Sequence, residues 1–257
     1  MTHTITPRDS KYGWKRDLPD HRDHILNTAK VAPLPPSVDL RAGMPPVYDQ
    51  GQLGSCTGNA IAAAFDYERK RQAEPFVNPS RLFIYYNERA IEHTTRSDAG
   101  ANIRDGIKSV NATGVCPESE WPYDIAKFAR KPANKCYADA IKTHSIAYQS
   151  VQRAGGATDV MTALAQTGPV VFGFSVFASF ESRQVAATGI VPMPSPNEQM
   201  VGGHAVVAVG YDQNQQMFTV RNSWGAAWGD AGYFRMPFAY LADPNLASDL
   251  WCISLVS

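Results

Sequence analysis

The sequence predicts an α+β protein with two lobes, because helical patterns fill its first half and strand patterns its second half. From Cys56 to Gly114, apolar residues recur at helical spacing. From about Thr143 onward, short runs rich in Val, Ile, Phe and Tyr are separated by Gly and Pro, which is typical of strands. At 257 residues, the chain is long enough to form two lobes. We expect them at 37–143 and 144–257, after an arm at 1–36.

Residues 1–36 are expected to form an extended arm rather than a small domain. The segment 12–24 is charged and has no apolar periodicity, and prolines at 33, 35 and 36 close the arm. Proline fixes φ and biases the preceding residue toward extended geometry. His21 and His24 stand beside aspartates, but no third cluster of ligands accompanies them, so we predict a solvated arm without a metal site.

Three helices are predicted in the first lobe. The first begins at Cys56 and reaches about Arg71. The second starts at Asn78-Pro79-Ser80, where an N-cap residue precedes a proline in the first turn. The third covers 102–110 and stops at Gly114, a residue suited to the left-handed conformation that closes helices.

The second lobe is predicted to hold one helix and a set of strands. The helix runs from Asp159 to Gln166 and ends at Gly168. The strands are rich in β-branched and aromatic residues and are bounded by Gly and Pro. Their expected ranges are 169–176, 203–211, 217–221, 232–236 and 250–256.

Composition argues against several classes of function. The chain has 24 basic and 24 acidic residues and a net charge of zero, so it lacks the electrostatic footprint of a protein that binds nucleic acid or anionic membrane. No apolar stretch approaches the roughly 18 residues of a transmembrane helix. The first residues lack the apolar region of a secretory signal, which leaves the cytoplasm or export by another route open.

A glycine-containing loop runs into a predicted helix at Cys56. The loop is Asp49-Gln50-Gly51-Gln52-Leu53-Gly54-Ser55, and the cysteine takes the position where the helix begins. The N–H groups at a helix start are unsatisfied and the dipole is positive there, so a thiolate is stabilised relative to the thiol. We therefore expect the pKa of Cys56 to lie below the ordinary value of about 8.5 and the thiolate to act as a nucleophile.

A base and an orienting partner for this nucleophile follow much later in the chain. His204 opens an apolar, β-branched run, and Asn222 stands before Ser223 and Trp224. The order Cys, His, Asn, with the His about 150 residues after the Cys, is the spacing expected of a papain-type thiol protease.

These motifs resemble the papain-like cysteine peptidase family, in the form of a bacterial-type member with a short N-terminal arm. The matching stretches are 50–51, 54–56, 203–206, 209–211, 222–225, 228–229 and 232–233. The stretch from Pro36 to Arg41 resembles the start of a mature family enzyme, so the resemblance covers about 35–257. It implies a helical lobe and a β-barrel-like lobe with the active-site cleft between them.

Two positions depart from the family pattern. The family usually carries a cysteine where this chain has Leu53, and a Trp or Tyr where it has Thr57. The first change removes half of a disulfide beside the active-site loop, and the second removes a ring from the first turn after the nucleophile. Neither residue carries the chemistry, so the catalytic role of Cys56 is unaffected.

The resemblance implies a role for each polar residue of the site. His204 would pair with Cys56 as imidazolium and then protonate the leaving amine. Asn222 would orient the imidazole, and the Trp224 indole would shield their hydrogen bond from water. The Gln50 amide and the Cys56 backbone N–H would meet the developing oxyanion. No cofactor and no metal are implied.

Substrate contacts are also implied by the resemblance. Trp228 corresponds to an aromatic residue on the leaving-group side, and Gly100 to a glycine whose backbone binds substrate in an extended form. Small residues in the second subsite, which sets specificity, would leave room for a bulky apolar side chain. The implied substrate-binding residues are Gly100, Ile103, Gly173, Gly203, Trp224 and Trp228.

The redox state of the four cysteines is open. If Cys56 is the nucleophile, at most two of Cys116, Cys136 and Cys252 can pair with each other. Cys136 lies where the family often has a disulfide cysteine, but the usual partner position falls near Tyr86. A Cys116–Cys136 bond is one alternative, and a fully reduced chain, which the missing secretory signal favours, is the other.

We expect a monomeric cysteine endopeptidase that acts on peptides or proteins through an acyl-enzyme. One alternative is an acyl transferase that uses the same Cys-His pair, although related transferases generally carry Asp where this chain has Asn222. The other is a binding protein on a peptidase scaffold, against which the retention of all four polar site residues argues. The arm takes the place of the family's propeptide, so we expect it across or beside the cleft, where it restrains activity.

Overall fold

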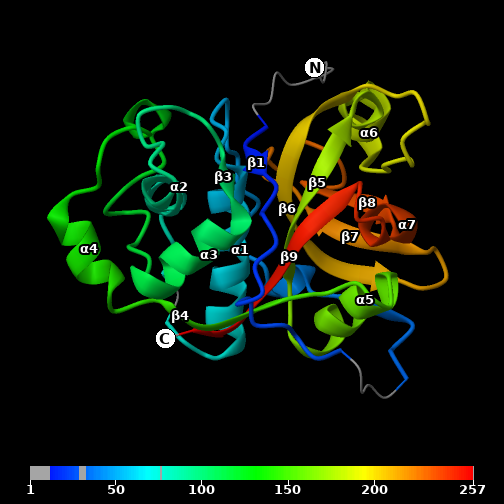
Figure 1. The fold of residues 1–257 in the computed structure, drawn as a ribbon, viewed down its shortest axis with the longest axis horizontal. Coiled ribbons are helices and arrows are strands. Elements are labelled where there is room, and N and C mark those ends of the chain that lie inside the picture. Colours follow the sequence, from blue (N-terminus) through cyan, green and yellow to red (C-terminus); the bar gives the residue numbers. More distant parts are fainter. Residues whose placement is uncertain (1–11, 29–32, 76, 257) are drawn as a thin grey trace.

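The computed structural model describes residues 12–28, 33–75 and 77–256, and it shows two lobes that meet along a central helix (Figure 1). This helix, α1 (Cys56–Arg71), contacts the helices of its own lobe and strands of the other lobe. The first lobe also contains α2 (Arg81–Ile91), α3 (Ile103–Ala112) and α4 (Asn134–Ala140). The predicted α+β class, with helices first and strands later, is confirmed.

The second lobe is built on a seven-stranded sheet with antiparallel neighbours. The strand order is β4-β9-β5-β6-β7-β8, and β2 pairs with the far end of β6. The strands are β2 (Ser37–Asp39), β4 (Ser145–Ser150), β5 (Val170–Phe177), β6 (Met200–Asp212), β7 (Met217–Arg221), β8 (Tyr233–Pro237) and β9 (Ala247–Val256). The helices of this lobe are α5 (Ala157–Gln166), α6 (Arg183–Thr188) and α7 (Phe238–Ala242).

This sheet is open, whereas the resemblance implies a barrel-like lobe. Among the described residues, the two ends of the strand path, β4 and β8, do not pair with each other. Helix α7 contacts both β8 and β9. The lobe is therefore a helix-covered antiparallel sheet rather than a closed barrel.

Three clusters of apolar side chains form the core, and one of them joins the two lobes. The joining cluster packs Ile61 and Phe65 of α1 against Val171 of β5 and Trp251 of β9. Most residues of α1 are buried, so the helix cannot shift without opening this interface. Its N-terminus, where Cys56 stands, is thereby held at the boundary between the lobes.

Most long elements lie where their sequence pattern predicts them. Helix α1 begins and ends at the predicted residues, and β7 covers the predicted 217–221. Helix α2 starts later than predicted because Ser80, not Asn78, is its N-cap and accepts a hydrogen bond from the Phe83 N–H at 3.1 Å. The short elements α4, α6, α7 and β4 were not predicted, because packing against neighbours sustains them more than their own propensity does.

Residues 12–28 of the arm run between the two lobes (Figure 1). Its strand β1 (Trp14–Lys15) pairs in parallel with β3 (Ala101–Asn102) of the helical lobe. Further along, Ile25 forms a bridge to β4, and Asp23 forms an ion pair with Arg104 at 2.7 Å. Residues 1–11 and 29–32 of the predicted arm lie outside the described residues.

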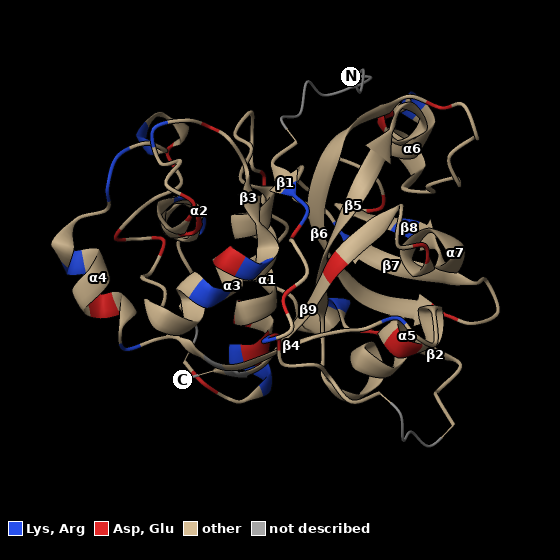
Figure 2. Ribbon diagram, in the orientation of Figure 1, with Lys and Arg blue, Asp and Glu red and all other residues tan. Residues whose placement is uncertain are grey.

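Charged side chains of both signs are interspersed over the two lobes (Figure 2). Within the described ranges, no three His, Cys, Asp or Glu side chains gather as metal ligands would. No helix in this part of the chain has the length and apolar character needed to cross a membrane. All four cysteines are buried and free, so the Cys116–Cys136 disulfide considered above is absent.

Candidate active site

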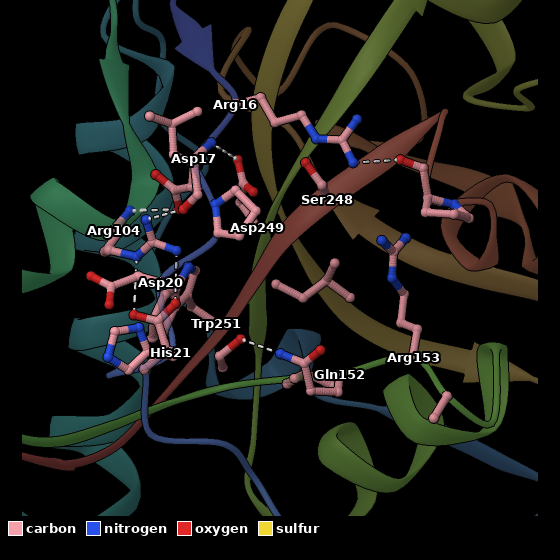
Figure 3. Close-up of a pocket in the computed structure, with 18 of the residues that line it drawn as sticks. Arg16, Asp17, Asp20, His21, Arg104, Gln152, Arg153, Ser248, Asp249 and Trp251 are labelled. Atoms are coloured by element: carbon pink, nitrogen blue, oxygen red, sulfur yellow. Dashed lines mark hydrogen bonds and ion pairs between the residues drawn. The ribbon is translucent and has the colours of Figure 1, made fainter.

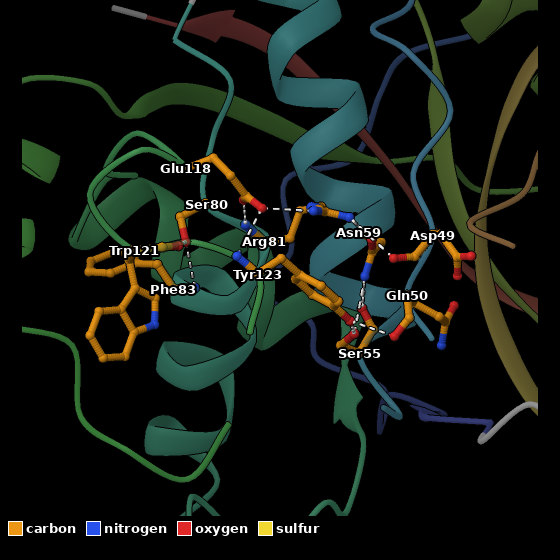
Figure 4. A network of polar contacts seen from close by, with 10 residues as sticks. All are labelled: Asp49, Gln50, Ser55, Asn59, Ser80, Arg81, Phe83, Glu118, Trp121 and Tyr123. Carbon is orange, nitrogen blue, oxygen red and sulfur yellow. Dashed lines mark hydrogen bonds and ion pairs between the residues drawn. The ribbon is translucent and has the colours of Figure 1, made fainter. Parts of the chain in front are cut away.

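The loop before α1 is fixed by polar contacts in place of a disulfide (Figure 4). The Tyr123 hydroxyl donates a hydrogen bond to the Gln50 carbonyl at 2.9 Å and also contacts the Ser55 hydroxyl. One turn into α1, the Asn59 amide donates to the Ser55 carbonyl at 2.9 Å. Leu53, which replaces the cysteine, is buried in the apolar cluster of the helical lobe. Packing and hydrogen bonds therefore hold this loop.

The second departure, Thr57, contacts a carboxyl group beneath the first turn of α1. Its hydroxyl donates to Glu88 of α2 at 2.5 Å, and Glu88 is fully buried. Burial raises the pKa of Glu88 well above its ordinary value. The sequence analysis missed this pair, although a small hydroxyl residue in place of an aromatic ring leaves room for such a contact.

His204 lies on β6 and is bonded to Asn222, which follows β7. The distance from His204 Nε2 to Asn222 Oδ1 is 2.8 Å, and because an amide oxygen only accepts, Nε2 carries the proton. The Trp224 indole stacks on the imidazole with ring centroids 5.0 Å apart. The other ring nitrogen, Nδ1, is buried and has no hydrogen-bond partner within the described ranges. His204 is thus oriented and shielded, with one nitrogen left to accept a proton.

The pKa values of the thiol and the imidazole are both shifted toward the neutral forms. Burial raises the pKa of Cys56 to about 11, although backbone hydrogen bonds from Ala205, Gly13 and Thr57 act in the opposite direction. Burial lowers the pKa of His204 to about 4, although its bond to Asn222 opposes this. The expected lowering of the Cys56 pKa is therefore wrong for this arrangement, because the helix start does not offset the loss of water.

Gln50 lies between the two walls of the site and is fully buried. Its amide nitrogen donates to the Leu53 carbonyl at 2.9 Å, and its amide oxygen accepts from the Ser223 hydroxyl at 2.6 Å. Its backbone N–H also donates to the Ser223 carbonyl at 2.8 Å. Gln50 therefore ties the loop of the nucleophile to the segment that carries Asn222.

The glycines assigned to substrate binding line the path of the arm. A Cβ at Gly100 would lie 2.1 Å from the Gly13 carbonyl oxygen, and one at Gly173 would lie 1.9 Å from the Trp14 ring. A Cβ at Gly203 would lie 2.7 Å from the same ring. Only glycine permits these approaches. The three positions therefore border the surface that the arm covers.

The other assigned residues lie behind that surface. Ile103 is fully buried in the joining cluster, against which Trp14 packs. Trp228 packs edge-on against Trp224 with ring centroids 5.2 Å apart, inside the core of the β-rich lobe. Both residues support the site in this arrangement rather than form its surface.

Three arm residues at the site were missed by the sequence analysis. Gly13 approaches both the Cys56 sulfur and the Gly54 carbonyl, and the Ala101 N–H donates to the Gly13 carbonyl at 2.7 Å. Tyr12 lies edge-on to His204 at 6.0 Å and donates its hydroxyl to Glu181 at 2.5 Å. Trp14, the next residue, places its ring against Gly173 and Gly203. A Tyr-Gly-Trp triplet within a charged segment was the available signal.

Comparisons with known proteins identify the family of this chain. The model of the papain family of cysteine proteases matches residues 34–240. An uncharacterized peptidase C1-like protein of Acanthamoeba polyphaga mimivirus is 46% identical over 242 residues, covering 91% of this chain and 76% of that protein. Cysteine proteinase 3 of Entamoeba histolytica is 31% identical over 234 residues, covering 86% and 68%.

Solved structures give the same result. Xylellain, a cysteine protease from Xylella fastidiosa, is 42% identical and superposes with a TM-score of 0.87 over the whole of both chains. Digestive procathepsin L 3 of Tenebrio molitor is 22% identical with a TM-score of 0.72, covering 91% of this chain and 75% of that chain. The second likeness supports the fold alone.

Proposed function

This chain belongs to the papain family of cysteine proteases and is a cysteine peptidase, and from that premise we propose that it is an endopeptidase in which Cys56 attacks the peptide carbonyl. The observation that carries the proposal is the His204–Asn222 hydrogen bond of 2.8 Å under the Trp224 indole, across the lobe boundary from Cys56. An inert buried thiol would not require an imidazole oriented in this way.

The chemistry follows from the positions of the protons. When water enters the cleft, the cost of charging both groups falls, and the Cys56 proton moves to the open Nδ1 of His204. The thiolate attacks the carbonyl carbon, and the Cys56 backbone N–H and the Gln50 amide stabilise the oxyanion. His204 then protonates the leaving amine as the acyl-enzyme forms. Water hydrolyses the thioester and restores the thiol.

The two alternative functions receive less support. An acyl transferase would use the same thioester, but nothing in the described residues favours a second amine over water as its acceptor. A binding protein would not need the ring of His204 held by Asn222 and covered by Trp224. Hydrolysis therefore remains the proposed reaction, on peptide or protein substrates and without a cofactor.

We also propose that the arm inhibits this reaction. It pairs with β3 through Ala101, covers Cys56 with the Gly13 backbone and places Tyr12 beside His204. Water and substrate cannot reach the sulfur while these contacts exist, and the neutral forms of Cys56 and His204 result from the same burial. Because the arm is tethered, its effective concentration is high even if each contact is weak.

Labelling with an epoxysuccinyl peptide tests the proposed nucleophile. We expect a single adduct, formed when the thiolate opens the epoxide, and mass spectrometry should place it on Cys56. Cys116, Cys136 and Cys252 should remain unmodified, because they are buried in the cores of the individual lobes and not at the boundary that the arm covers. A Cys56→Ala variant is the control and should show no adduct. An adduct on another cysteine, or none on any after prolonged exposure, contradicts the proposed site.

The pH dependence of arm docking follows from Asp17, which lies against Asp249 of β9 (Figure 3). In the docked arm the pKa of Asp17 is raised from 3.8 to about 7, first by burial and then by Asp249, with Arg104 acting oppositely. An undocked arm leaves this carboxyl near its ordinary pKa. Docking therefore takes up a proton between about pH 4 and 7. Docking is strongest below this pH window. As the pH rises through the window, the free energy of docking becomes less favourable by roughly 4 kcal/mol.

Hydrogen exchange at Ala101 measures this effect, because its N–H is bonded to the arm at Gly13. In an inactive Cys56→Ala chain, we expect the protection of this amide, corrected for intrinsic exchange, to fall as pH rises from 4 to 7. An added Asp17→Asn substitution should weaken the dependence, since residue 17 no longer takes up a proton. Protection that stays constant over this range, or rises, contradicts the assignment to Asp17.

A further inference from the structure

One tyrosine hydroxyl contacts both ends of the loop that supplies the two proposed oxyanion donors. The Tyr123 hydroxyl donates to the Gln50 carbonyl at 2.9 Å and contacts the Ser55 hydroxyl (Figure 4). Gln50 carries the side-chain amide, and Ser55 directly precedes Cys56, whose backbone N–H is the second donor. The spacing of the two donors therefore depends on where Tyr123 holds the ends of this loop.

The hydrogen bonds at this hydroxyl form a chain with a single direction. Because the Gln50 carbonyl can only accept, the Tyr123 proton points to it, and the Ser55 hydroxyl donates to the Tyr123 oxygen. The Ser55 oxygen accepts from the Asn59 amide at 3.1 Å, and the Asn59 amide oxygen accepts from the Arg81 guanidinium at 3.3 Å. Asn59 and Ser55 are buried, and a chain that begins at a cation and passes through buried groups strengthens its later hydrogen bonds. The Gln50 carbonyl is thus held firmly.

An ion pair fixes the tyrosine ring. The Arg81 guanidinium lies over the Tyr123 ring, 4.1 Å from its centroid, and pairs with Glu118 at 2.7 Å (Figure 4). The same carboxylate accepts the Tyr123 backbone N–H at 3.1 Å. A guanidinium that is both stacked and ion-paired restricts the tilt of the ring. Glu118 therefore holds the tyrosine through its backbone and through the cation that covers its ring.

The loop needs this support because its two ends are bound to different lobes. Ser55 leads into α1 of the helical lobe, whereas the Gln50 backbone N–H and side-chain oxygen bond to Ser223 of the β-rich lobe. Gly51 and Gly54 make the backbone between the ends adaptable, and the free cysteines provide no crosslink. A small shift between the lobes would therefore separate the two oxyanion donors, and the bond from Tyr123 to the Gln50 carbonyl resists it.

We propose that Tyr123 is a positioning residue for the oxyanion, because its hydroxyl holds the Gln50 amide at a fixed distance from the Cys56 backbone N–H. The inference rests on the proposed peptidase function and adds to it a residue that acts through Gln50. The chain of hydrogen bonds includes neither the thiol nor the imidazole. Its loss should therefore slow the steps in which a carbonyl oxygen gains negative charge and spare the reactivity of the thiol itself.

The test compares two reactions of the same thiol in the full chain. Hydrolysis of a fluorogenic dipeptide amide builds an oxyanion, whereas iodoacetamide loses iodide from a saturated carbon and builds none. For Tyr123→Phe we expect kcat to fall roughly tenfold to a hundredfold, a part of the loss caused by removing a whole oxyanion donor, with KM within about twofold. Alkylation of Cys56 at pH 7 should stay within about twofold of the wild-type rate. Both chains carry the same arm, so its docking cancels from the comparison.

Tyr137→Phe is the matched control, because its hydroxyl bonds to Asn87 at 3.1 Å in the same lobe but outside this chain of hydrogen bonds. It should leave both reactions unchanged. A second variant, Glu118→Gln, weakens the ion pair over the ring and keeps the tyrosine hydroxyl. We expect a smaller loss of kcat in the same direction, again with alkylation unchanged.

Three results would be decisive against the proposals. Equal losses of hydrolysis and alkylation in Tyr123→Phe indicate a general distortion of the site and overturn the positioning role. Wild-type kcat in a Tyr123→Phe chain that is folded, as its unfolding midpoint shows, overturns it as well. If the wild-type chain is alkylated at Cys56 but cleaves no amide even after the arm is released, the proposed peptidase function fails instead.

Discussion

Cys56→Ala is expected to reduce peptide hydrolysis by at least about four orders of magnitude, the scale seen when a nucleophile is removed from a catalytic triad. The side chain is the only thiol at the lobe boundary next to His204 among the described residues, and no other group there can form the acyl-enzyme. Turnover of a fluorogenic dipeptide amide measures the loss. Because Cys56 is buried in the joining cluster, the unfolding midpoint should also fall slightly, by the cost of one small core truncation.

Cys252→Ala is the matched control for this loss. Cys252 is equally buried, but it lies on β9 in the core of the β-rich lobe, away from the catalytic groups. We expect its replacement to lower stability by about 1 kcal/mol and to leave turnover nearly unchanged. If the Cys56→Ala chain is folded, as its unfolding midpoint shows, and still turns over substrate at the wild-type rate, Cys56 is not the nucleophile.

The parts of the fold that the sequence predicts are those with a long, regular pattern. Helix α1 could be placed because apolar residues recur along it from a glycine-containing loop, and β5 to β9 because β-branched runs are bounded by Gly and Pro. The beginning of α2 was misplaced by two or three residues because Asn78 and Ser80 are both good caps, and only the Phe83 contact decides between them. Short helices such as α7 depend on tertiary contacts that no local pattern encodes.

For the site, the pairing of His204 with Asn222 could be predicted from the sequence, but the protonation of the thiol and the imidazole could not. The spacing of Cys56, His204 and Asn222 indicates which side chains meet. In the structure His204 is bonded to Asn222, and the Ala205 backbone, next to His204, lies against Cys56. The direction of the Cys56 pKa was wrong because it depends on what excludes water from the sulfur. That role falls to Gly13, which lies in a segment without periodicity and contributes no side chain. A local pattern cannot reveal such a contact.

Gly13→Ala is expected to release the arm and to accelerate alkylation of Cys56 by iodoacetamide on the order of a hundredfold at pH 7. A Cβ at position 13 would lie 1.7 Å from the Gly54 carbonyl oxygen. The position of a Cβ and of a backbone oxygen does not depend on the side-chain rotamer, so no rotamer change relieves the clash. Release admits water, so the thiol pKa should fall from about 11 toward or below its ordinary value. The thiolate fraction at pH 7 then rises by more than two orders of magnitude.

The pH profile and two further variants separate release of the arm from general destabilisation. In the wild type, the alkylation rate should rise about tenfold per pH unit throughout the neutral range, whereas in Gly13→Ala it should level off well below pH 8.5 if the thiolate–imidazolium pair forms. Leu18→Ala, at an arm side chain that is 81% exposed, is the control and should alkylate at the wild-type rate. Deleting residues 1–33 should match Gly13→Ala in both alkylation rate and kcat/KM. If Gly13→Ala and the deletion both behave as the wild type, the arm does not limit access to Cys56, because each removes the Gly13 contact by a different route.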